Sequence, residues 1–382
     1  MTTLRIIIDD MLAPVPNGIS RYTEELSRAL IVHAPLNCKV EGIVAASTEE
    51  EYRSIGDRLP GLAGLYKSSL ARRELLSAWQ HGFTRLPGGG MIHATSLLAP
   101  LSRHDRLHDQ GHQIAVTIHD VVAWTHPESL APRRVAWHKS MAQRAFKYAD
   151  AVVVPTHAVA VQLAEIHDFG DRVRVIGGAV GSRLTVQPDA DARAERLGLP
   201  ERYLLTIGGL ESRRGIDQLL AALALPGATD LPLLVVGPDS EAEEGDGSVS
   251  AAAADAGLPE RRVRALGNLS DEDLSVVLDR AVMLVFPTLA EGFGLPMLEA
   301  FHFGTPVVHS DAPALVEVAG EAGYGVELED RDGYPQRLLN AINHVAGDDD
   351  LQQRLGTYGR DRAGLFTWQA AAEKVWQLHA DL

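Results

Sequence analysis

The sequence predicts an α/β protein with two domains, each built on a parallel β-sheet. Short, nearly unbroken apolar runs recur along the chain, at residues 4–8, 114–118 and 282–286, and such runs are typical of strands buried on both faces. Segments with helical apolar spacing, such as residues 19–32 and 216–225, alternate with them. A chain of 382 residues is long enough to bury two separate cores.

The second half of the chain continues this alternation. Three more apolar runs predict strands at residues 233–237, 263–267 and 304–308. Residues 313–320 are expected to be helical. A final apolar-faced helix is expected in residues 366–382, with Thr367 as its N-cap because a threonine hydroxyl can accept from the first free amides.

The domain boundary is expected between Gly177 and Tyr203. A last strand of the first domain is predicted at residues 173–176, and a polar break follows it at residues 187–191. The predicted ranges are therefore 1–180 for the first domain, 201–365 for the second and 366–382 for the final helix.

Residues 281–300 form the most informative stretch, since two carboxylates flank a glycine-rich turn at the start of a helix. Glu291 lies in the turn and Glu299 about one helical turn inside the helix. Gly292 and Gly294 remove Cβ atoms where backbone N–H groups could approach a ligand, and a helix N-terminus adds a positive dipole end. The stretch therefore predicts a site for an anionic ligand.

Two adjacent arginines, Arg213 and Arg214, follow another predicted strand and precede the helical segment 216–225. An isolated arginine pair is usually a solvated surface feature. A diphosphate, however, needs fixed cations close to the backbone, and arginine offers a planar fork of donors. The position directly after a buried strand favours a ligand-binding role for this pair.

The spacing E-G-F-G-x-P-x-x-E resembles the E-x7-E motif of retaining, nucleotide-sugar-dependent family 4 glycosyltransferases. The resemblance implies the GT-B fold, with two Rossmann-like α/β/α domains facing a cleft and a C-terminal helix crossing back to the N-terminal domain. In that family the first Glu and the following amides meet the donor sugar, here Glu291 with Phe293, Gly294 and Leu295. The second Glu, here Glu299, binds the ribose.

A second motif, at residues 208–215, is similar to the G-x-L-E-x-R-K sequence that opens the donor domain of this family. The resemblance places Gly209 at the donor, and Arg213 and Arg214 at the diphosphate. The sequence departs from the family pattern at Ser212, where proline is usual, and at Arg214, where lysine is usual. The positive charge is retained at position 214, but the point-charge geometry of lysine is not.

Four further residues are assigned by the same resemblance. Asn268 and Leu269 follow a predicted strand and correspond to residues that lie against the nucleobase through main-chain contacts. His119 ends the strand V-x-x-H-D and corresponds to a histidine that contacts the donor sugar, although a lone histidine is more often structural. Gly18 resembles the glycine of the first βα loop, which approaches the donor phosphate.

A metal site is not expected. The adjacent Asp9 and Asp10 lack the D-x-D spacing of metal-dependent glycosyltransferases, so we expect helix capping or solvation for them. The 15 histidines show no ligand spacing, and the resemblance implies a metal-independent enzyme without a cofactor other than its nucleotide-sugar donor.

A basic segment at residues 131–147 is a candidate for contact with an anionic membrane. Its cationic residues are interleaved with Val135, Trp137 and Met141, and many relatives use a basic, partly apolar face in this way. An ordinary solvated helix is an equally good interpretation. The cationic set comprises Arg133, Arg134, His138, Lys139, Arg144 and Lys147.

Composition favours a cytoplasmic protein. The single cysteine, Cys38, cannot form an internal disulfide, and neither a membrane-spanning run nor a signal peptide is expected. The net charge of −16 disfavours general nucleic-acid binding, because the protein would repel a phosphate backbone. Almost all of the negative charge falls after residue 180, so an anionic acceptor or membrane would meet the first domain more easily.

The resemblance therefore implies transfer of a hexosyl group, with retention of configuration, from a nucleotide diphosphate sugar to a glycan or lipid-linked acceptor. The motifs look most like the mannosyl- and rhamnosyltransferase branch of bacterial polysaccharide assembly, which makes GDP-mannose the first expected donor. Three alternatives stay open: a GT-B epimerase or hydrolase, a catalytically silent nucleotide- or glycan-binding subunit, and a nicotinamide oxidoreductase. The last is least favoured, because no G-x-G-x-x-G follows the first strand.

Overall fold

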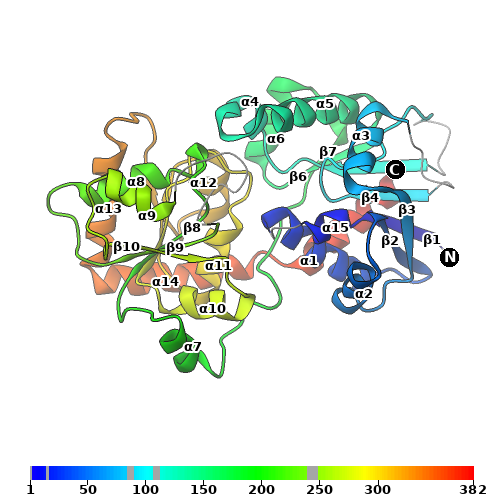
Figure 1. Ribbon diagram of the computed structural model, residues 1–382. Coiled ribbons are helices and arrows are strands. Elements are labelled where there is room, and N and C mark those ends of the chain that lie inside the picture. The colour runs from blue at the N-terminus through cyan, green and yellow to red at the C-terminus, as the bar shows by residue number, and fades with distance from the viewer. Residues whose placement is uncertain (1, 14–16, 84–89, 106–111, 239–247) are drawn as a thin grey trace. The chain divides into compact units, whose positions relative to one another are not determined.

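The computed structural model describes residues 2–13, 17–83, 90–105, 112–238 and 248–382 (Figure 1). The chain divides into two compact units. Unit 1 comprises Met1–Trp124, Pro132–Gly178 and Thr367–Leu382, and unit 2 comprises Thr125–Ala131 and Ala179–Phe366. Residues 181–200, which lie between the first two predicted domain ranges, group with unit 2.

Unit 1 is built on a seven-stranded parallel sheet with the order β3-β2-β1-β4-β5-β6-β7. The strands are β1 (Thr2–Ile7), β2 (Cys38–Ala46), β3 (Gly64–Ala71), β4 (Gly90–Ala94), β5 (His112–Thr117), β6 (Ala151–Val154) and β7 (Val173–Val175). The helices are α1 (Gly18–Val32), α2 (Glu49–Arg58), α3 (Arg72–His81), α4 (Val122–Thr125), α5 (Pro132–Tyr148), α6 (His157–Ile166) and α15 (Trp368–Asp381), with short 3-10 helices η1 (Asp9–Leu12) and η3 (Gly170–Arg172).

Unit 2 is built on a six-stranded parallel sheet with the order β10-β9-β8-β11-β12-β13. The strands are β8 (Leu204–Ile207), β9 (Leu233–Val236), β10 (Val263–Gly267), β11 (Met283–Phe286), β12 (Val307–Ser310) and β13 (Tyr324–Val326). The helices are α7 (Ala190–Arg196), α8 (Ile216–Ala224), α9 (Val249–Asp255), α10 (Asp271–Arg280), α11 (Leu295–Phe303), α12 (Pro313–Ala319), α13 (Tyr334–Ala346) and α14 (Asp349–Gly364), with 3-10 helices η2 (Pro127–Ser129) and η4 (Ser212–Arg214).

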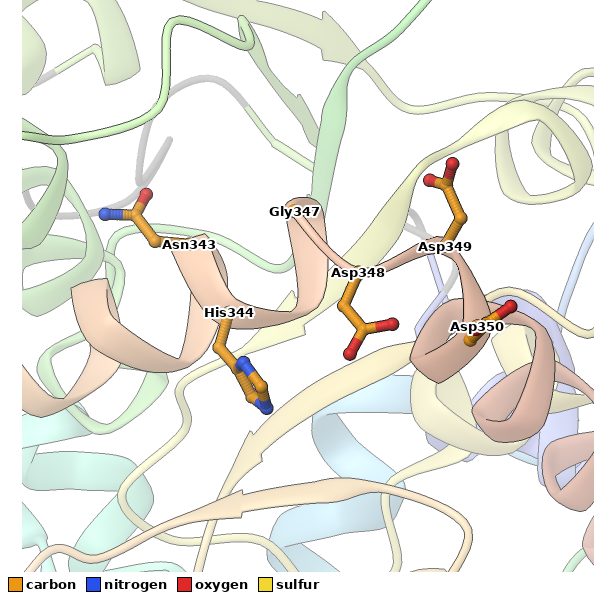
Figure 2. Close-up of a pocket in the computed structure, with 6 residues that line it drawn as sticks. All are labelled: Asn343, His344, Gly347, Asp348, Asp349 and Asp350. Carbon is orange, nitrogen blue, oxygen red and sulfur yellow. The ribbon is translucent and has the colours of Figure 1, made fainter.

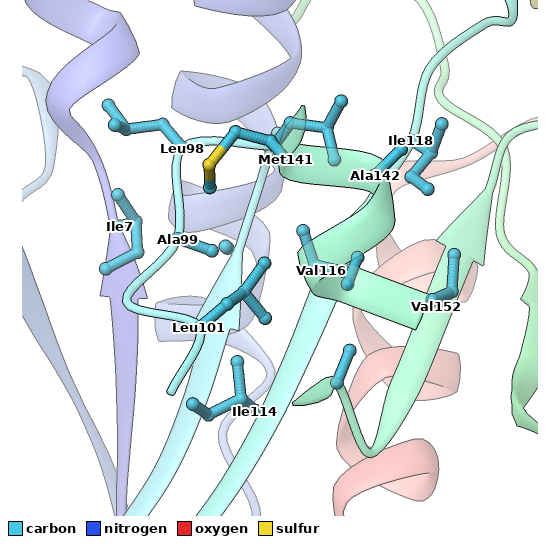
Figure 3. Close-up of a cluster of buried hydrophobic side chains, with 14 of the residues drawn as sticks. Ile7, Leu98, Ala99, Leu101, Ile114, Val116, Ile118, Met141, Ala142 and Val152 are labelled. Carbon is cyan, nitrogen blue, oxygen red and sulfur yellow. The ribbon is translucent and has the colours of Figure 1, made fainter. Parts of the chain in front are cut away.

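Each sheet is covered on both faces, which explains why inner strands such as β6, β9 and β11 are apolar throughout. In unit 2, α8, α9 and α13 pack on one face, while α10, α11 and α12 pack on the other. In unit 1, α3, α5 and α6 cover one face, and α1, α2 and α15 cover the other. Figure 3 shows the core on the unit 1 face that α3, α5 and α6 cover. Met141 of α5, Val116 of β5 and Leu98 belong to this core. The two-domain α/β prediction is confirmed.

The final helix returns to unit 1, as predicted. Thr367 caps α15, because its hydroxyl accepts from the Ala370 N–H at 3.1 Å. Val375 and Trp376 are buried against α1, and the Trp376 indole N–H donates to the carbonyl of Leu30 at 3.3 Å.

The expectation that Asp9 and Asp10 cap a helix or face solvent is wrong. Asp9 is 1% exposed and accepts from the Ala45 N–H at 2.9 Å. The Arg72 guanidinium pairs with both carboxylates, and Asp10 also accepts from the Ser96 hydroxyl at 2.6 Å. Arg72 lies more than sixty residues away in the sequence, so no local pattern could reveal this pairing.

Candidate functional site

The candidate site lies at the carboxyl edge of the unit 2 sheet, between β8 and β11. The strand order reverses there, since the chain proceeds from β8 to β9 and β10 on one side and from β11 to β12 and β13 on the other. In open parallel sheets, ligands bind outside the carboxyl ends of the strands at such a switch point. The loops after β8 and β11 carry both sequence motifs.

These two loops are joined by their backbones. The Arg213 carbonyl accepts from the Leu289 N–H at 2.7 Å and from the Thr288 hydroxyl at 2.9 Å. Gly215 has φ +66°, and a Cβ there would lie 2.3 Å from the Pro287 carbonyl oxygen. Only glycine permits this approach, so the loop after β8 is closed directly onto the loop after β11.

The contact brings the predicted charged residues together. Glu291 pairs with Arg214 at 2.7 Å and with Arg213 at 4.0 Å. All three side chains are largely buried, with 15–23% of each exposed. A carboxylate between two guanidinium groups leaves positive charge and N–H donors near the sheet edge, which suits an anionic ligand.

Helix α11 starts beside this cluster. Gly294 precedes it with φ +88°, and its Cβ would lie 2.6 Å from a methyl of Leu315, so a larger residue cannot take this place. Within the described residues, no side chain caps this helix end. Phe293, which is 8% exposed, packs edge-to-face on Phe366 with centroids 5.7 Å apart. The loop is thereby fixed while the positive end of α11 is left to a ligand.

Glu299 lies one turn inside α11 and is 3% exposed, whereas Leu295 opens the helix and is partly exposed. Gly209 follows β8, and a Cβ there would meet the Glu211 carboxylate at 2.7 Å. The structure thus places all these predicted residues in the two adjoining loops or on α11.

Asn268 and Leu269 are not part of that cluster. They follow β10, which is the edge strand two positions from β8. Asn268 is exposed and Leu269 is partly buried against the core. A ligand held at Arg213 and Glu291 would have to extend across the ends of β8 and β9 to reach them.

In unit 1, His119 follows β5 and is held by its neighbours. Its Nε2 lies 2.7 Å from the Thr95 carbonyl oxygen, so Nε2 carries the proton in that contact. The Tyr22 ring meets the imidazole edge-to-face at 4.8 Å. The imidazole is therefore oriented with Nδ1 as its second hydrogen-bonding atom.

Gly18 is the first residue of α1 and is exposed. The Asn17 side chain accepts from the Ile19 and Ser20 N–H groups at 3.0 and 3.1 Å. Side-chain capping occupies two of the amides that an anion would otherwise use at this helix end.

The predicted basic helix exists as α5, but its apolar residues do not form an exposed face. Met141 is 0% exposed in the core, and Trp137 packs against the same core. Arg144 also turns inward, where it donates to the Leu101 carbonyl. Burial lowers the pKa of His138. The exposed cationic residues of α5 are Arg133, Arg134, Lys139 and Lys147.

Metal-ligand clusters and membrane-spanning helices are absent from the described residues. No group of three or more His, Cys, Asp or Glu side chains within them is arranged to hold a metal ion. None of the helices among them combines the length and apolarity needed to cross a membrane. A hollow of about 540 Å³ lies between α13 and α14 (Figure 2). It is lined by Asn343, His344, Gly347, Asp348, Asp349 and Asp350, so it is acidic and unsuited to a phosphate.

Sequence reasoning missed two buried hydroxyls near the site. Thr288 and Ser310 are both 0% exposed, and each follows or ends a strand of the sheet at its carboxyl edge. The sequence signal for Thr288 is its place directly after Pro287, since a polar group at the end of a buried strand needs a hydrogen-bond partner.

Two α/β units with parallel sheets, and a helix that returns to unit 1, define the GT-B fold. Solved structures confirm this class. HepE from Anabaena, in complex with UDP and glucose, matches with a TM-score of 0.72 and 17% identity over 100% of both chains. At that identity the match establishes the fold alone.

Within unit 2, residues 189–362 match the model of the family described as "Glycosyl transferases group 1". Two similar proteins come from Escherichia coli. "O-antigen chain mannosyltransferase B" is 28% identical over 266 residues, which cover 66% of each chain. "Serotype-specific mannosyltransferase WbdA" is 32% identical over 236 residues, which cover 59% of this chain and 28% of the relative. The chain thus spans less than two thirds of the length of these relatives.

Proposed function

We propose that the protein is a glycosyltransferase that moves a hexosyl group from a nucleotide diphosphate sugar to a glycan or lipid-linked acceptor. The observation that supports this most directly is the joining of Arg213, Arg214 and Glu291 beside the uncapped start of α11. Guanidinium groups and helix amides are the donors that a diphosphate requires. The group 1 match covers these same residues.

In the proposed reaction, negative charge develops on the diphosphate as the bond to the sugar breaks. Arg213, Arg214 and the amides at Gly294 and Leu295 would stabilise that charge where it forms. Because Arg214 already bonds Glu291, its remaining N–H groups can serve the phosphate without losing that contact. A lysine ammonium could not bind two anions in this way, because its N–H donors are not arranged in a planar fork.

We assign Glu291 and the amide of Phe293 to the sugar and Glu299 to the ribose. Gly209, Asn268 and Leu269 are assigned to the nucleotide through main-chain contacts. From unit 1, His119 and Gly18 are proposed as further donor-contacting residues. No side chain among these is an obvious covalent nucleophile, so we propose retention of configuration through attack on the face that the diphosphate leaves, without a metal ion.

GDP-mannose is the proposed donor, because the two curated relatives are named mannosyltransferases. HepE was solved with UDP and glucose, so a uridine donor is the competing possibility that the test must separate. We further propose action in the cytoplasm on bacterial polysaccharide or glycoconjugate intermediates. The exposed cations of α5 would then contact an anionic membrane through charge alone, since their apolar neighbours are buried.

Calorimetric titration with GDP, UDP and dTDP, each with and without Mg²⁺, tests the donor site on the wild type and on Glu299→Ala. We expect one nucleotide to bind without a metal and to lose affinity in the variant. Binding of none would contradict the proposal. Release of that nucleotide from its sugar donor only when an acceptor is added would exclude a hydrolase and a silent subunit, and NMR of the product would assign its anomeric configuration.

A further inference from the structure

We infer that Thr288 is a positioning residue, which sets the geometry of the arginines against Glu291 without touching the donor. This role rests on the proposed function. Thr288 lies in the loop after β11, three residues before Glu291, and is 0% exposed. Its hydroxyl donates across to the Arg213 carbonyl at 2.9 Å, and the Ala290 carbonyl is a weaker acceptor at 3.3 Å.

The hydroxyl acts on the main chain where the two loops of the site are joined. Arg213 and Arg214 extend from the loop after β8, whereas Glu291 extends from the loop after β11. The Thr288 hydroxyl and the adjacent Leu289 N–H are the donors to the Arg213 carbonyl, and both come from the second loop. Removing the hydroxyl removes one hydrogen bond between the two loops, so the loops can shift relative to each other.

Thr288 is itself held from the other side. The Ser310 hydroxyl, at the end of β12, donates to the Thr288 carbonyl at 2.5 Å. Ser310 is 0% exposed. A chain of hydrogen bonds therefore runs from β12 through Thr288 to Arg213, across the carboxyl ends of three adjacent strands. Rigid support of this kind matters because displacements near 1 Å in a catalytic site can lower turnover about 100-fold.

Unit 2 contains a matched control. Thr305 is 3% exposed, and its hydroxyl donates to the Leu278 carbonyl at 2.6 Å. It lies between α11 and β12, away from the loops after β8 and β11. Thr305→Val therefore removes a buried hydroxyl and a hydrogen bond to a carbonyl, as Thr288→Val does, but leaves the arginine loop untouched.

The test compares donor kinetics and thermal stability of Thr288→Val, Thr288→Ser, Ser310→Ala and Thr305→Val, all measured on the full chain with a saturating acceptor. For Thr288→Val we expect kcat to fall about 10- to 100-fold while KM for the donor changes less than about threefold, because the arginines act on charge that develops in the transition state. Thr288→Ser should restore kcat, and Ser310→Ala should give a smaller loss of the same kind.

Equal kcat for Thr288→Val and Thr305→Val would overturn this role, and so would a loss in Thr288→Ser as large as that in Thr288→Val. If Thr288→Val does not fold, Thr288→Ser and Ser310→Ala still decide the matter, because wild-type kcat in Ser310→Ala would contradict the hydrogen-bond chain. A wild-type protein that turns over no donor overturns the proposed function together with this role, whereas an active wild type with unaffected variants overturns this role alone.

Discussion

The carboxyl edges of the two sheets share a topology but differ in charge. In unit 1, Arg72 lies between Asp9 and Asp10, so one guanidinium meets two carboxylates. In unit 2, Arg213 and Arg214 both face Glu291, so two guanidinium groups meet one carboxylate.

The helices that follow these edges differ in whether a side chain caps their N-terminal amides. The amides at the start of α1 are bonded to the side chain of Asn17, whereas no described side chain caps α11 at Gly294. A parallel sheet and a helix N-terminus are therefore not sufficient for an anion site. The helix amides must also be left without a side-chain cap, as those at the start of α11 are within the described residues.

The largest effect is expected from removing a cation of unit 2. Arg213→Ala should lower kcat/KM for the donor by about 100- to 1,000-fold, as the loss of one donor to developing charge does in other enzymes. Arg196→Ala is the control, because Arg196 also belongs to unit 2 but pairs with Asp273 at 2.6 Å and is 58% exposed. Steady-state kinetics on both variants check this. Similar kcat/KM values for the two variants would contradict the proposed contrast between the units.

Removing the cation of unit 1 should instead affect stability. Arg72→Ala leaves Asp9 buried without its ion-pair partner, and burial already raises the pKa of that carboxyl. We expect the free energy of unfolding to fall by about 3 kcal/mol. All five tryptophans belong to unit 1, so their fluorescence during urea unfolding reports on this unit. Nucleotide affinity of the folded variant should be unchanged, and a weakened affinity would show that unit 1 contributes charge to the donor.

Acid should destabilise unit 1 through a buried histidine pair. His93 is 0% exposed, and burial lowers its pKa from 6.5 to about 4. Burial also lowers the pKa of His379, whose Nε2 lies 3.4 Å from Nδ1 of His93. Because the unfolded chain takes up the proton first, the stability from neutral His93 is present above pH 6.5 and is lost as the pH falls toward 4.

We expect the free energy of unfolding of unit 1 to fall by about 2 kcal/mol from pH 7 to pH 5 on account of His93 alone. His93→Gln should reduce this pH dependence, whatever its stability at pH 7. Tryptophan fluorescence in urea at the two pH values measures the difference. An unchanged pH dependence in the variant would mean that His93 is not the group that titrates.

The smallest effect concerns the cap of α1. Asn17→Ala should lower the free energy of unfolding of unit 1 by about 1 kcal/mol, since it frees the amides of Ile19 and Ser20. The same fluorescence measurement checks it. If those amides served the donor phosphate, the variant would instead alter nucleotide affinity with little change in stability, and the two helix ends would no longer contrast.

The sequence was sufficient for the two-domain α/β class and for strands β8 to β12 of unit 2, whereas β2, β3, β4 and β6 of unit 1 carried no strand prediction. Apolar runs predicted these strands because both faces of each sheet are covered, and the glycine-rich turn around Gly294 predicted the start of α11. The motifs around Arg213 and Glu291 were found because they lie within short segments. The adjacency of β8 and β11, which the strand order shows, brings those segments together.

Interactions across distant segments were not predictable in the same way. The pairing of Arg72 with Asp9 and the bond from Ser310 to Thr288 each depend on which strands are neighbours. A membrane-facing surface was one of two equally good interpretations of residues 131–147, whereas Met141 faces the core. Helical spacing locates an apolar stripe, but whether that stripe meets a sheet or a membrane depends on the rest of the fold.

The return of α15 to unit 1 has a consequence for synthesis in the cell. The ribosome makes every other part of unit 1 first, then all of Ala179–Phe366, and only then the helix that buries its apolar side against α1. At ordinary translation rates this delay is on the order of ten to forty seconds. During that time the nascent unit 1 exposes the apolar surface that Val375 and Trp376 later cover, so we expect chaperones to bind it.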